Sequence, residues 1–178
     1  AAQVQGRDYR SARGDLALRD QLRLFERSGT WFVIFNTAKP PWNNAAVRRA
    51  LSMVLDRDSL VSRVFDEPTL PAHALTPPSI LPRDKPAAPP DIEGARVLLA
   101  KAGHPNGKGL PVARFTYHRT ETWQRLAAEL AQRWGETLGV RIEPDEREWR
   151  DFLAFTGDPG GFDLYRAGWT SEYRDPVN

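Results

Sequence analysis

The sequence contains no cysteine, a single methionine and only three histidines among its 178 residues. Without cysteine, the chain has no disulfide bonds, thiolate metal sites or thiol catalysis. The histidines, His73, His104 and His118, have no pair three or four residues apart, the spacing that lets two ligands on a helix share a metal ion. We therefore expect no metal site and no cofactor.

Long hydrophobic runs and a strong charge of one sign are also missing. No stretch approaches 18 consecutive apolar residues, which excludes a membrane-spanning helix. The chain has 25 Lys and Arg against 23 Asp and Glu, a net charge of +2, with bases and acids interleaved. This balance gives no indication of nucleic-acid binding. Hydrophobic residues at 40% and charged residues at 27% are typical of a folded globular domain.

The short motifs that carry common catalytic chemistry are absent. There is no G-x-S-x-G turn for a serine nucleophile, no phosphate-binding P-loop and no G-x-G-x-x-G after a strand. Acidic residues are numerous, but their spacing is typical of helix surfaces and pairs no two of them as acid and base. We therefore expect that the chain is not an enzyme.

The first 30 residues are polar and differ from the rest of the chain. Six arginines and four acids are mixed there, which indicates a solvated approach segment or linker. A basic arm for an acidic partner is the alternative, which the interleaved acids disfavour. The chain begins Ala1-Ala2 and Met53 is its only methionine, so we expect it to be processed or cut from a longer protein.

Residues 66–90 contain eight of the fifteen prolines, which predicts an extended connection without helices or strands. A connection of this length is either an interdomain linker or a long loop that wraps the lobe. The apolar residues Leu75, Ile80 and Leu81 favour wrapping, because a free linker has no use for them. We therefore expect one partial lobe over residues 31–178, with 66–90 as a wrapping loop.

Hydrophobic periodicity predicts alternating strands and helices across this lobe, and so an α/β fold on a mostly parallel sheet. The run 31–35 is expected to be buried on both faces, and Pro144 is expected to lie beyond the third strand. The predicted strands cover 31–35, 112–117, 140–142 and 162–169, and the predicted helices cover 44–55, 58–65, 91–102, 120–138 and 148–155. The expected N-caps are Asn43 or Asn44, Asp58, Asp91, and Thr120 or Thr122.

Aromatic residues near strand ends are the first candidates for a ligand site. Trp123 follows a strand and Trp169 ends one, which is where α/β sheets bind ligands. His118 also follows a strand. It either faces a cleft or is an ordinary polar residue without a functional role. The remaining tryptophans with a predicted place are Trp31, Trp134 and Trp149, expected in the core, and Trp42, a candidate staple before a helix.

Several segments, taken in order, resemble one family. The stretch Phe35-Asn-Thr-Ala-Lys-Pro-Pro-Trp-Asn-Asn, the segment 47–58 and the segment 95–103 with its Leu-Leu-Ala-Lys-Ala-Gly ending are three of them. The last is Phe162-Asp-Leu-Tyr-Arg-Ala-Gly-Trp169. Together they resemble the large C-terminal lobe of extracytoplasmic oligopeptide-binding proteins, the solute receptors of peptide ABC transporters. The resemblance covers residues 31–178.

The resemblance implies a periplasmic-binding-protein type II-like lobe, with a mixed, mostly parallel sheet flanked by helices. It implies a receptor that captures oligopeptides and delivers them to an ABC importer, so the expected partners are a peptide and the permease subunits. An N-terminal lobe that is missing from this chain is expected to complete the receptor. The expected location is periplasmic, or extracytoplasmic and membrane-anchored, with any signal segment removed.

The same resemblance implies the residues that hold the peptide. Arg166, Gly168 and Thr170 correspond to positions of backbone contact, and the Arg166 side chain to one that meets the carboxylate of short peptides. Glu172 stands where the family has an Asp that receives the peptide's α-ammonium. Trp123 replaces a basic residue of some members, for which His118 or Arg119 are substitutes. The other ligand-binding positions implied are Tyr117, His118, Trp123 and Trp169.

Residue chemistry alone leaves other interpretations open. Glu172 and Arg174 can instead form an exposed ion pair worth about 0–1 kcal/mol. The Glu in place of Asp also allows a receptor for a different solute, such as a metal chelate, a sugar or an opine. An enzyme or scaffolding domain that uses the same lobe is the interpretation from another functional class.

Overall fold

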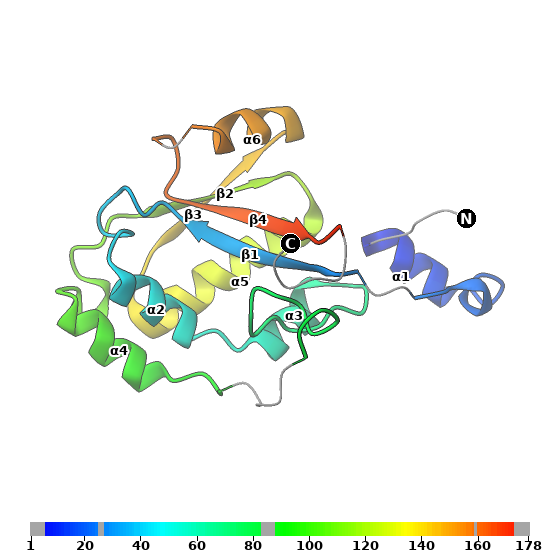
Figure 1. Cartoon of the computed structure of the whole chain (residues 1–178), viewed down its shortest axis with the longest axis horizontal. Coiled ribbons are helices and arrows are strands. Elements are labelled where there is room, and N and C mark those ends of the chain that lie inside the picture. Colours follow the sequence, from blue (N-terminus) through cyan, green and yellow to red (C-terminus); the bar gives the residue numbers. More distant parts are fainter. Residues whose placement is uncertain (1–5, 25–26, 83–87, 159, 173–178) are drawn as a thin grey trace.

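The computed structural model describes residues 6–24, 27–82, 88–158 and 160–172 (Figure 1). The helices are α1 Gly6–Gly14, α2 Ala45–Met53, α3 Arg57–Val64, α4 Ile92–Lys101, α5 Glu121–Leu138 and α6 Trp149–Thr156. The strands are β1 Gly29–Phe35, β2 Ala113–His118, β3 Ile142–Arg147 and β4 Leu164–Thr170, and two short 3₁₀ turns are η1 Arg19–Gln21 and η2 Pro105–Gly107.

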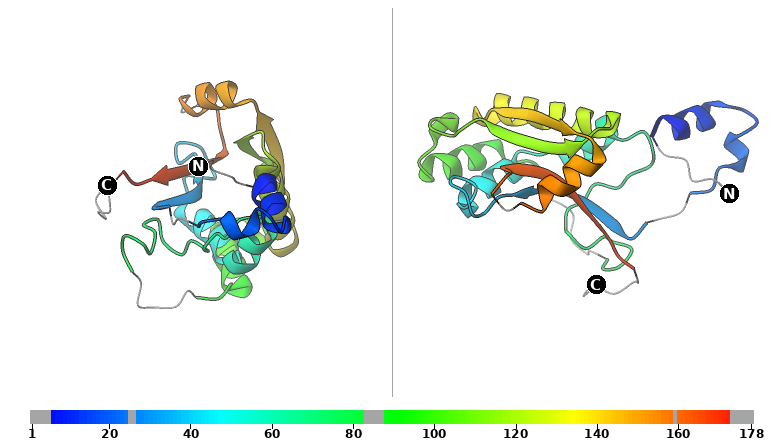
Figure 2. Two further views of the ribbon diagram at one scale, coloured as in Figure 1. Left: turned by 90° about the vertical axis from the view of Figure 1, so that its right-hand side faces the viewer. Right: turned by 90° about the horizontal axis from the view of Figure 1, so that it is seen from above.

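The strands form one sheet in the order β1-β4-β2-β3. β2 runs parallel to both β3 and β4, whereas β1 is antiparallel to β4. The predicted mixed, mostly parallel sheet is therefore confirmed. Figure 2 shows α5 and α6 on opposite sides of the sheet.

The core lies between the sheet and the helices α2, α4 and α5. Its centre is Trp134, which is 1% exposed and donates a hydrogen bond from Nε1 to the carbonyl of Leu51 at 2.9 Å. Trp42 is also buried and packs against Phe35, with ring centres 6.3 Å apart. The largest fully buried side chains are Trp42, Trp134, Phe115, Leu51, Leu99, Leu130, Leu138 and Leu164.

Most predicted caps are confirmed, and one is wrong. The side chains of Asn44, Asp91 and Thr120 accept hydrogen bonds from backbone amides at the starts of α2, α4 and α5. α3 is capped by Asp56 and not by Asp58, because Asp56 has the extended backbone of an N-cap and accepts from the amide of Ser59 at 3.1 Å. Asp58 lies one residue into the helix, in its first turn.

Two strand predictions are wrong. β1 is not buried on both faces, because most of its residues are only half-buried and its Trp31 is 47% exposed. β3 is an edge strand that begins at Ile142, where the predicted strand ends, and runs through Pro144 to Arg147. A proline costs no ladder hydrogen bond where its nitrogen faces away from the neighbouring strand.

The described parts of the proline-rich segment, 66–82 and 88–90, contain no helix or strand, as predicted. Leu75 and Leu81 are 65% and 51% exposed, so their burial does not hold this segment against the lobe. Among the helices that the structure describes, none is both long enough and apolar enough to span a membrane.

Candidate ligand-binding site

The candidate site lies where the two central strands separate (Figure 1). β2 and β4 are paired at only two positions, Phe115 with Leu164 and Thr116 with Tyr165. β4 continues past them with β1 alongside over its full length. Alternate amide and carbonyl groups of residues 166–170 therefore point away from β1, toward the side where β2 has diverged. This half-paired edge lies at the carboxyl end of β4, where α/β sheets bind ligands.

Arg166 occupies the gap between β2 and β4. It is 9% exposed, and its guanidinium carbon lies 4.5 Å from a ring centre of Trp123, 4.6 Å from that of Trp31 and 5.8 Å from that of Phe152. We call these three side chains the aromatic cage. Because Trp123 is on α5 and Phe152 is on α6, rings from both sides of the sheet meet at one cation.

Among the residues that the structure describes, no acid balances this buried charge. In the described part of the chain, no carboxylate lies within 4.0 Å of Arg166, and its buried Nε has no hydrogen-bond partner. Burial lowers the pKa of Arg166 to about 10, so the guanidinium is still protonated at pH 7. A buried cation without a counter-ion costs free energy, although the aromatic faces offset part of it. The site is therefore complementary to an anionic group of a ligand.

His118, the last residue of β2, meets the same cluster from the other strand. Its ring centre lies 4.9 Å from that of Trp149, 5.7 Å from Phe152 and 6.3 Å from Trp123. Its buried Nδ1 has no hydrogen-bond partner among the residues that the structure describes. Burial, and then the charge of Arg166, lower the pKa of His118 to about 4. His118 is therefore neutral at pH 7, and Arg166 alone supplies positive charge to this cluster.

Trp31 lies directly on Gly168. The two residues are partners in the β1–β4 ladder, and a Cβ atom at Gly168 would come within 1.9 Å of the indole Cε3 atom. Only glycine leaves room for the ring here. Because Trp31 is exposed on its other side, it separates Arg166 from solvent, and the prediction that it belongs to the core is wrong.

The structure brings three predicted ligand residues together, since Arg166, His118 and Trp123 form one cluster. Tyr117 is buried in the core beside Phe115, with ring centres 5.7 Å apart. The other predicted residues are exposed and follow Arg166 along the chain: Gly168, Trp169, Thr170 and, two residues beyond β4, Glu172. Arg174, the alternative partner of Glu172, lies outside the described residues.

Two aromatic residues of the cluster were not recognised as site residues from the sequence. Phe152 is buried against His118 and Arg166, and Trp149 lies beside it, although it is 53% exposed and not in the core as predicted. Both lie on the short helix α6, whose apolar residues have the pattern of an ordinary core-facing helix. No local sequence signal distinguishes a helix that faces the core from one that contacts the candidate site, because the gap between β2 and β4 is a tertiary feature.

The chemistry available at the site is that of a cation, aromatic faces and a strand edge. Among the described residues, no group of three His, Cys, Asp or Glu side chains is arranged to hold a metal ion. The arrangement can therefore bind an anionic group at Arg166 and pair with an extended backbone along β4.

Comparison with known proteins gives a consistent result. Residues 3–178 match the middle region of the bacterial extracellular solute-binding proteins, family 5. The periplasmic oligopeptide-binding protein OppA of Salmonella typhimurium is 34% identical over 156 residues, which are 84% of this chain and 28% of that protein. The periplasmic murein peptide-binding protein MppA of Escherichia coli is 31% identical, over 83% of this chain and 28% of its own length.

A solved structure agrees with these relatives. The structure of the Escherichia coli murein tripeptide binding protein MppA has a TM-score of 0.82 and 28% identity, covering 95% of this chain and 34% of that one. The chain thus spans less than a third of the length of the curated relatives it matches. It nevertheless matches the family over nearly all of its residues, and we conclude that the chain belongs to the bacterial extracellular solute-binding proteins of family 5.

Proposed function

We propose that this chain is a ligand-binding lobe of an extracytoplasmic receptor that captures oligopeptides and delivers them to an ABC importer. The observation that carries the proposal is the half-paired edge of β4 beside the uncompensated charge of Arg166. An extended peptide supplies both complements, because its backbone can pair with a strand edge and its α-carboxylate can neutralise a guanidinium. The relatives named for oligopeptides and murein peptides support this choice of ligand.

In this proposal the two ends of the peptide are held by opposite charges. Arg166 binds the α-carboxylate of a short peptide, and Glu172 binds the α-ammonium, which needs a fixed anion once it leaves water. Backbone groups at Arg166, Gly168 and Thr170 pair with the peptide between these ends. Tyr117, His118, Trp123 and Trp169 line the remaining positions, with bridging waters accommodating different side chains.

The rest of the receptor is proposed on the same basis. An N-terminal lobe closes over the other side of the peptide, as in hinged binding proteins, and the closed receptor docks on the permease subunits. The proposed location is the periplasm or the outer surface of the membrane, in line with relatives that are named periplasmic. Binding and release, without chemical change of the peptide, is the proposed activity.

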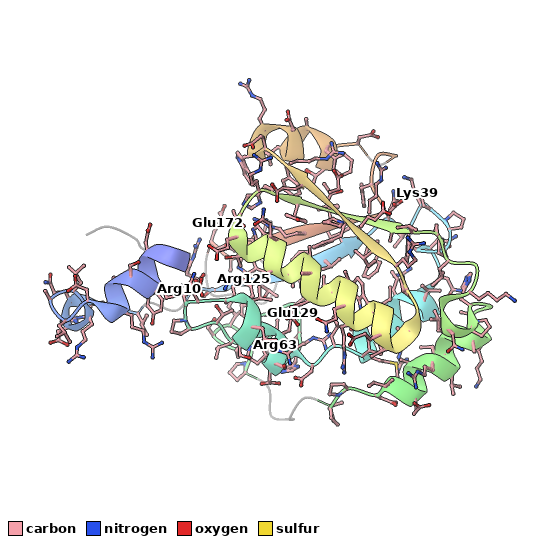
Figure 3. All side chains as sticks on the ribbon, turned by 180° about the vertical axis from the view of Figure 1, so that it is seen from behind. Arg10, Lys39, Arg63, Arg125, Glu129 and Glu172 are labelled. Carbon is pink, nitrogen blue, oxygen red and sulfur yellow. The ribbon has the colours of Figure 1, made fainter. Side chains whose placement is uncertain are left out.

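Native mass spectrometry with a mixture of tri- to pentapeptides tests the proposal, first on this chain and then on the full-length receptor. We expect retained peptides, with retention weakened by C-terminal amidation through Arg166 and by N-acetylation through Glu172. Glu172→Ala should weaken free peptides, and it should no longer distinguish them from N-acetylated ones. Glu129→Gln is the matched control, because Glu129 is an acid on α5 that pairs with Arg63 and not with the site (Figure 3).

Three results would reject the proposal or part of it. Failure of the full-length receptor to retain any peptide would reject the peptide ligand. Recovery of another solute from the purified receptor would favour a receptor of the same fold for that solute. Peptide hydrolysis that is lost in His118→Gln would establish an enzyme instead.

A further inference from the structure

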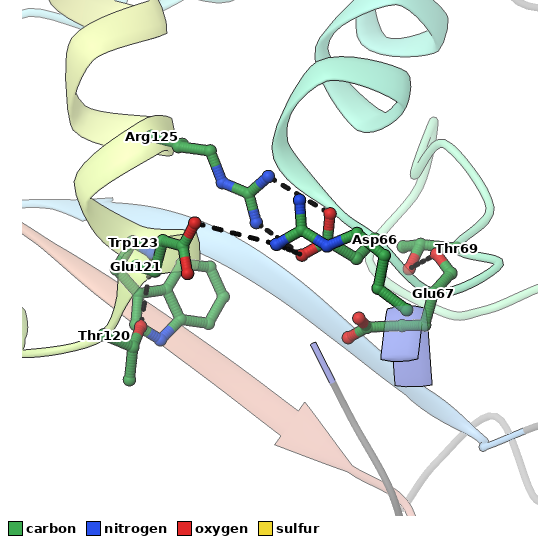
Figure 4. Close-up of polar contacts among 8 residues, drawn as sticks. Asp66, Glu67, Thr69, Thr120, Glu121, Trp123 and Arg125 are labelled. Atoms are coloured by element: carbon green, nitrogen blue, oxygen red, sulfur yellow. Dashed lines mark hydrogen bonds and ion pairs between the residues drawn. The ribbon is translucent and has the colours of Figure 1, made fainter. Parts of the chain in front are cut away.

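Asp66 lies just after α3, where three elements meet (Figure 4). Its side chain is 10% exposed and accepts hydrogen bonds from both terminal nitrogens of Arg125 on α5, at 3.2 and 2.8 Å. A terminal nitrogen of Arg10 on α1 lies 3.2 Å from the same carboxylate and 3.7 Å from Glu121, the first residue of α5. The hydrogen bond from Arg125 is the largest cause that lowers the pKa of Asp66, so this carboxylate is ionised at pH 7.

The residues next to this ion cluster (Arg10, Asp66, Glu121 and Arg125) contact the candidate site. Phe65, adjacent to Asp66, packs edge-on against Trp123, with ring centres 6.0 Å apart. Trp123 is two residues before Arg125 and is one of the rings of the aromatic cage around Arg166. Residues 65–66 therefore hold the first turn of α5 by one ionic and one aromatic contact. A shift of that turn moves a ring that touches Arg166.

Arg10 connects α1 to this arrangement. Figure 3 shows α1 at the flank of the lobe, with Arg10 reaching toward the start of α5. The Arg10 side chain is 52% exposed, so its ion pairs are partly screened by salt and weaker than the enclosed pair of Asp66 with Arg125. α1 is thus joined to the start of α5 by partly exposed ion pairs.

We propose that Asp66 is a positioning residue for the candidate site, and that its ion pair with Arg10 couples the placement of α1 to the aromatic cage around Arg166. With α1 docked, Arg10 and Arg125 share Asp66, Arg10 also pairs with Glu121, and the first turn of α5 is fixed against Phe65. With α1 released, Arg125 alone holds Asp66, and Trp123 gains freedom over Arg166. The position of α1 thereby affects the aromatic cage although α1 does not contact the ligand.

Fluorine NMR of the chain labelled with 5-fluorotryptophan tests this proposal without any peptide. The Trp123 signal is assigned with Trp123→Phe, and buried Trp134 serves as the internal reference. We expect Arg10→Gln to shift the Trp123 signal by more than its linewidth, and Arg10→Lys to restore it. Arg63→Gln is the matched control, because the Arg63–Glu129 pair also joins α3 to α5 but farther along α5.

Asp66→Asn should shift the Trp123 signal in the same direction as Arg10→Gln, and by a larger amount. Because Asp66 is enclosed, its variant is interpreted only if the far-ultraviolet circular dichroism is unchanged, whereas the exposed Arg10 variant carries the test by itself. An unshifted Trp123 signal in Arg10→Gln would overturn the proposal. An equal shift in Arg63→Gln would do the same, since it would show a general response of α5. Neither outcome depends on whether the ligand is a peptide.

Discussion

At the scale of a single residue, the surroundings of Arg166 differ from those of an arginine in an ordinary ion pair. Its neighbours are aromatic rings, whereas a structural arginine has carboxylates as neighbours. Arg125 is the contrast within the same molecule, because it is held by both oxygens of Asp66. One arginine is paired with a carboxylate, whereas the other is the proposed binding group for an anion.

This contrast predicts opposite effects of the same substitution. Arg166→Met should leave the free energy of unfolding within about 1 kcal/mol of the parent or raise it, because it removes a buried charge that has no counter-ion. Arg125→Met should lower it by about 2 kcal/mol, since Asp66 loses a charged two-point partner. Urea denaturation followed by circular dichroism measures both. Equal losses in the two variants would show that Arg166 is structural.

At the scale of elements, α3 shows how finely a helix start is specified. Asp56 and Asp58 are both acids before an apolar helix, but only Asp56 has the extended backbone that lets its side chain accept from the amide of Ser59. Asp58 instead lies in the first turn, where an acid interacts with the helix dipole.

The two acids should therefore differ in their contribution to stability. Asp56→Ala should lower the free energy of unfolding by about 1 kcal/mol, the usual cost of a lost N-cap. Asp58→Ala should cost about 0.3–0.5 kcal/mol, because it loses the dipole interaction and an exposed contact with His73, whose Nε2 lies 3.9 Å from the carboxylate. Thermal unfolding of the two variants at one pH distinguishes them. A larger loss in Asp58→Ala would restore the assignment of the cap to Asp58.

Elements with a local signal were predictable from the sequence, and those fixed by tertiary position were not. The cap Asp91 was predicted, and Asn44 and Thr120 were each predicted as one of two neighbouring candidates, because capping depends on residues within four positions of each other. The course of β3 through Pro144 was not, because the cost of a proline depends on whether its strand lies at an edge. Arg166 was predicted as a site residue from the resemblance alone. Its contact with Phe152 was not predictable, because it depends on where β2 and β4 separate.

For the whole molecule, the neutral state of His118 makes folding depend on pH. Its pKa is about 4 in the folded chain against an ordinary value of 6.5, so between these values the unfolded chain binds more protons. The free energy of unfolding should therefore fall as the pH falls from about 6.5 to 4, by the part that His118 contributes. Denaturation curves measured across this range give the slope of the free energy of unfolding against pH, and this slope should be smaller in His118→Gln.

His73→Gln is the control for this measurement, because His73 lies in the proline-rich segment and not in the aromatic cluster. The loss of slope in His118→Gln beyond any change in His73→Gln is the part that belongs to the buried ring. A slope unchanged in His118→Gln, or an NMR titration of His118 with a midpoint near 6.5, would contradict the burial of its neutral ring.

The two-position pairing of β2 with β4 also affects how the protein behaves when it is concentrated. A strand with unused amide and carbonyl groups is a template for any extended chain, including the same strand of a second molecule. Empty protein at high concentration is therefore the form most exposed to self-association, and occupation of the β4 edge protects against it. A ligand that fills the edge acts in storage as a solubility agent, whatever else it does for the cell.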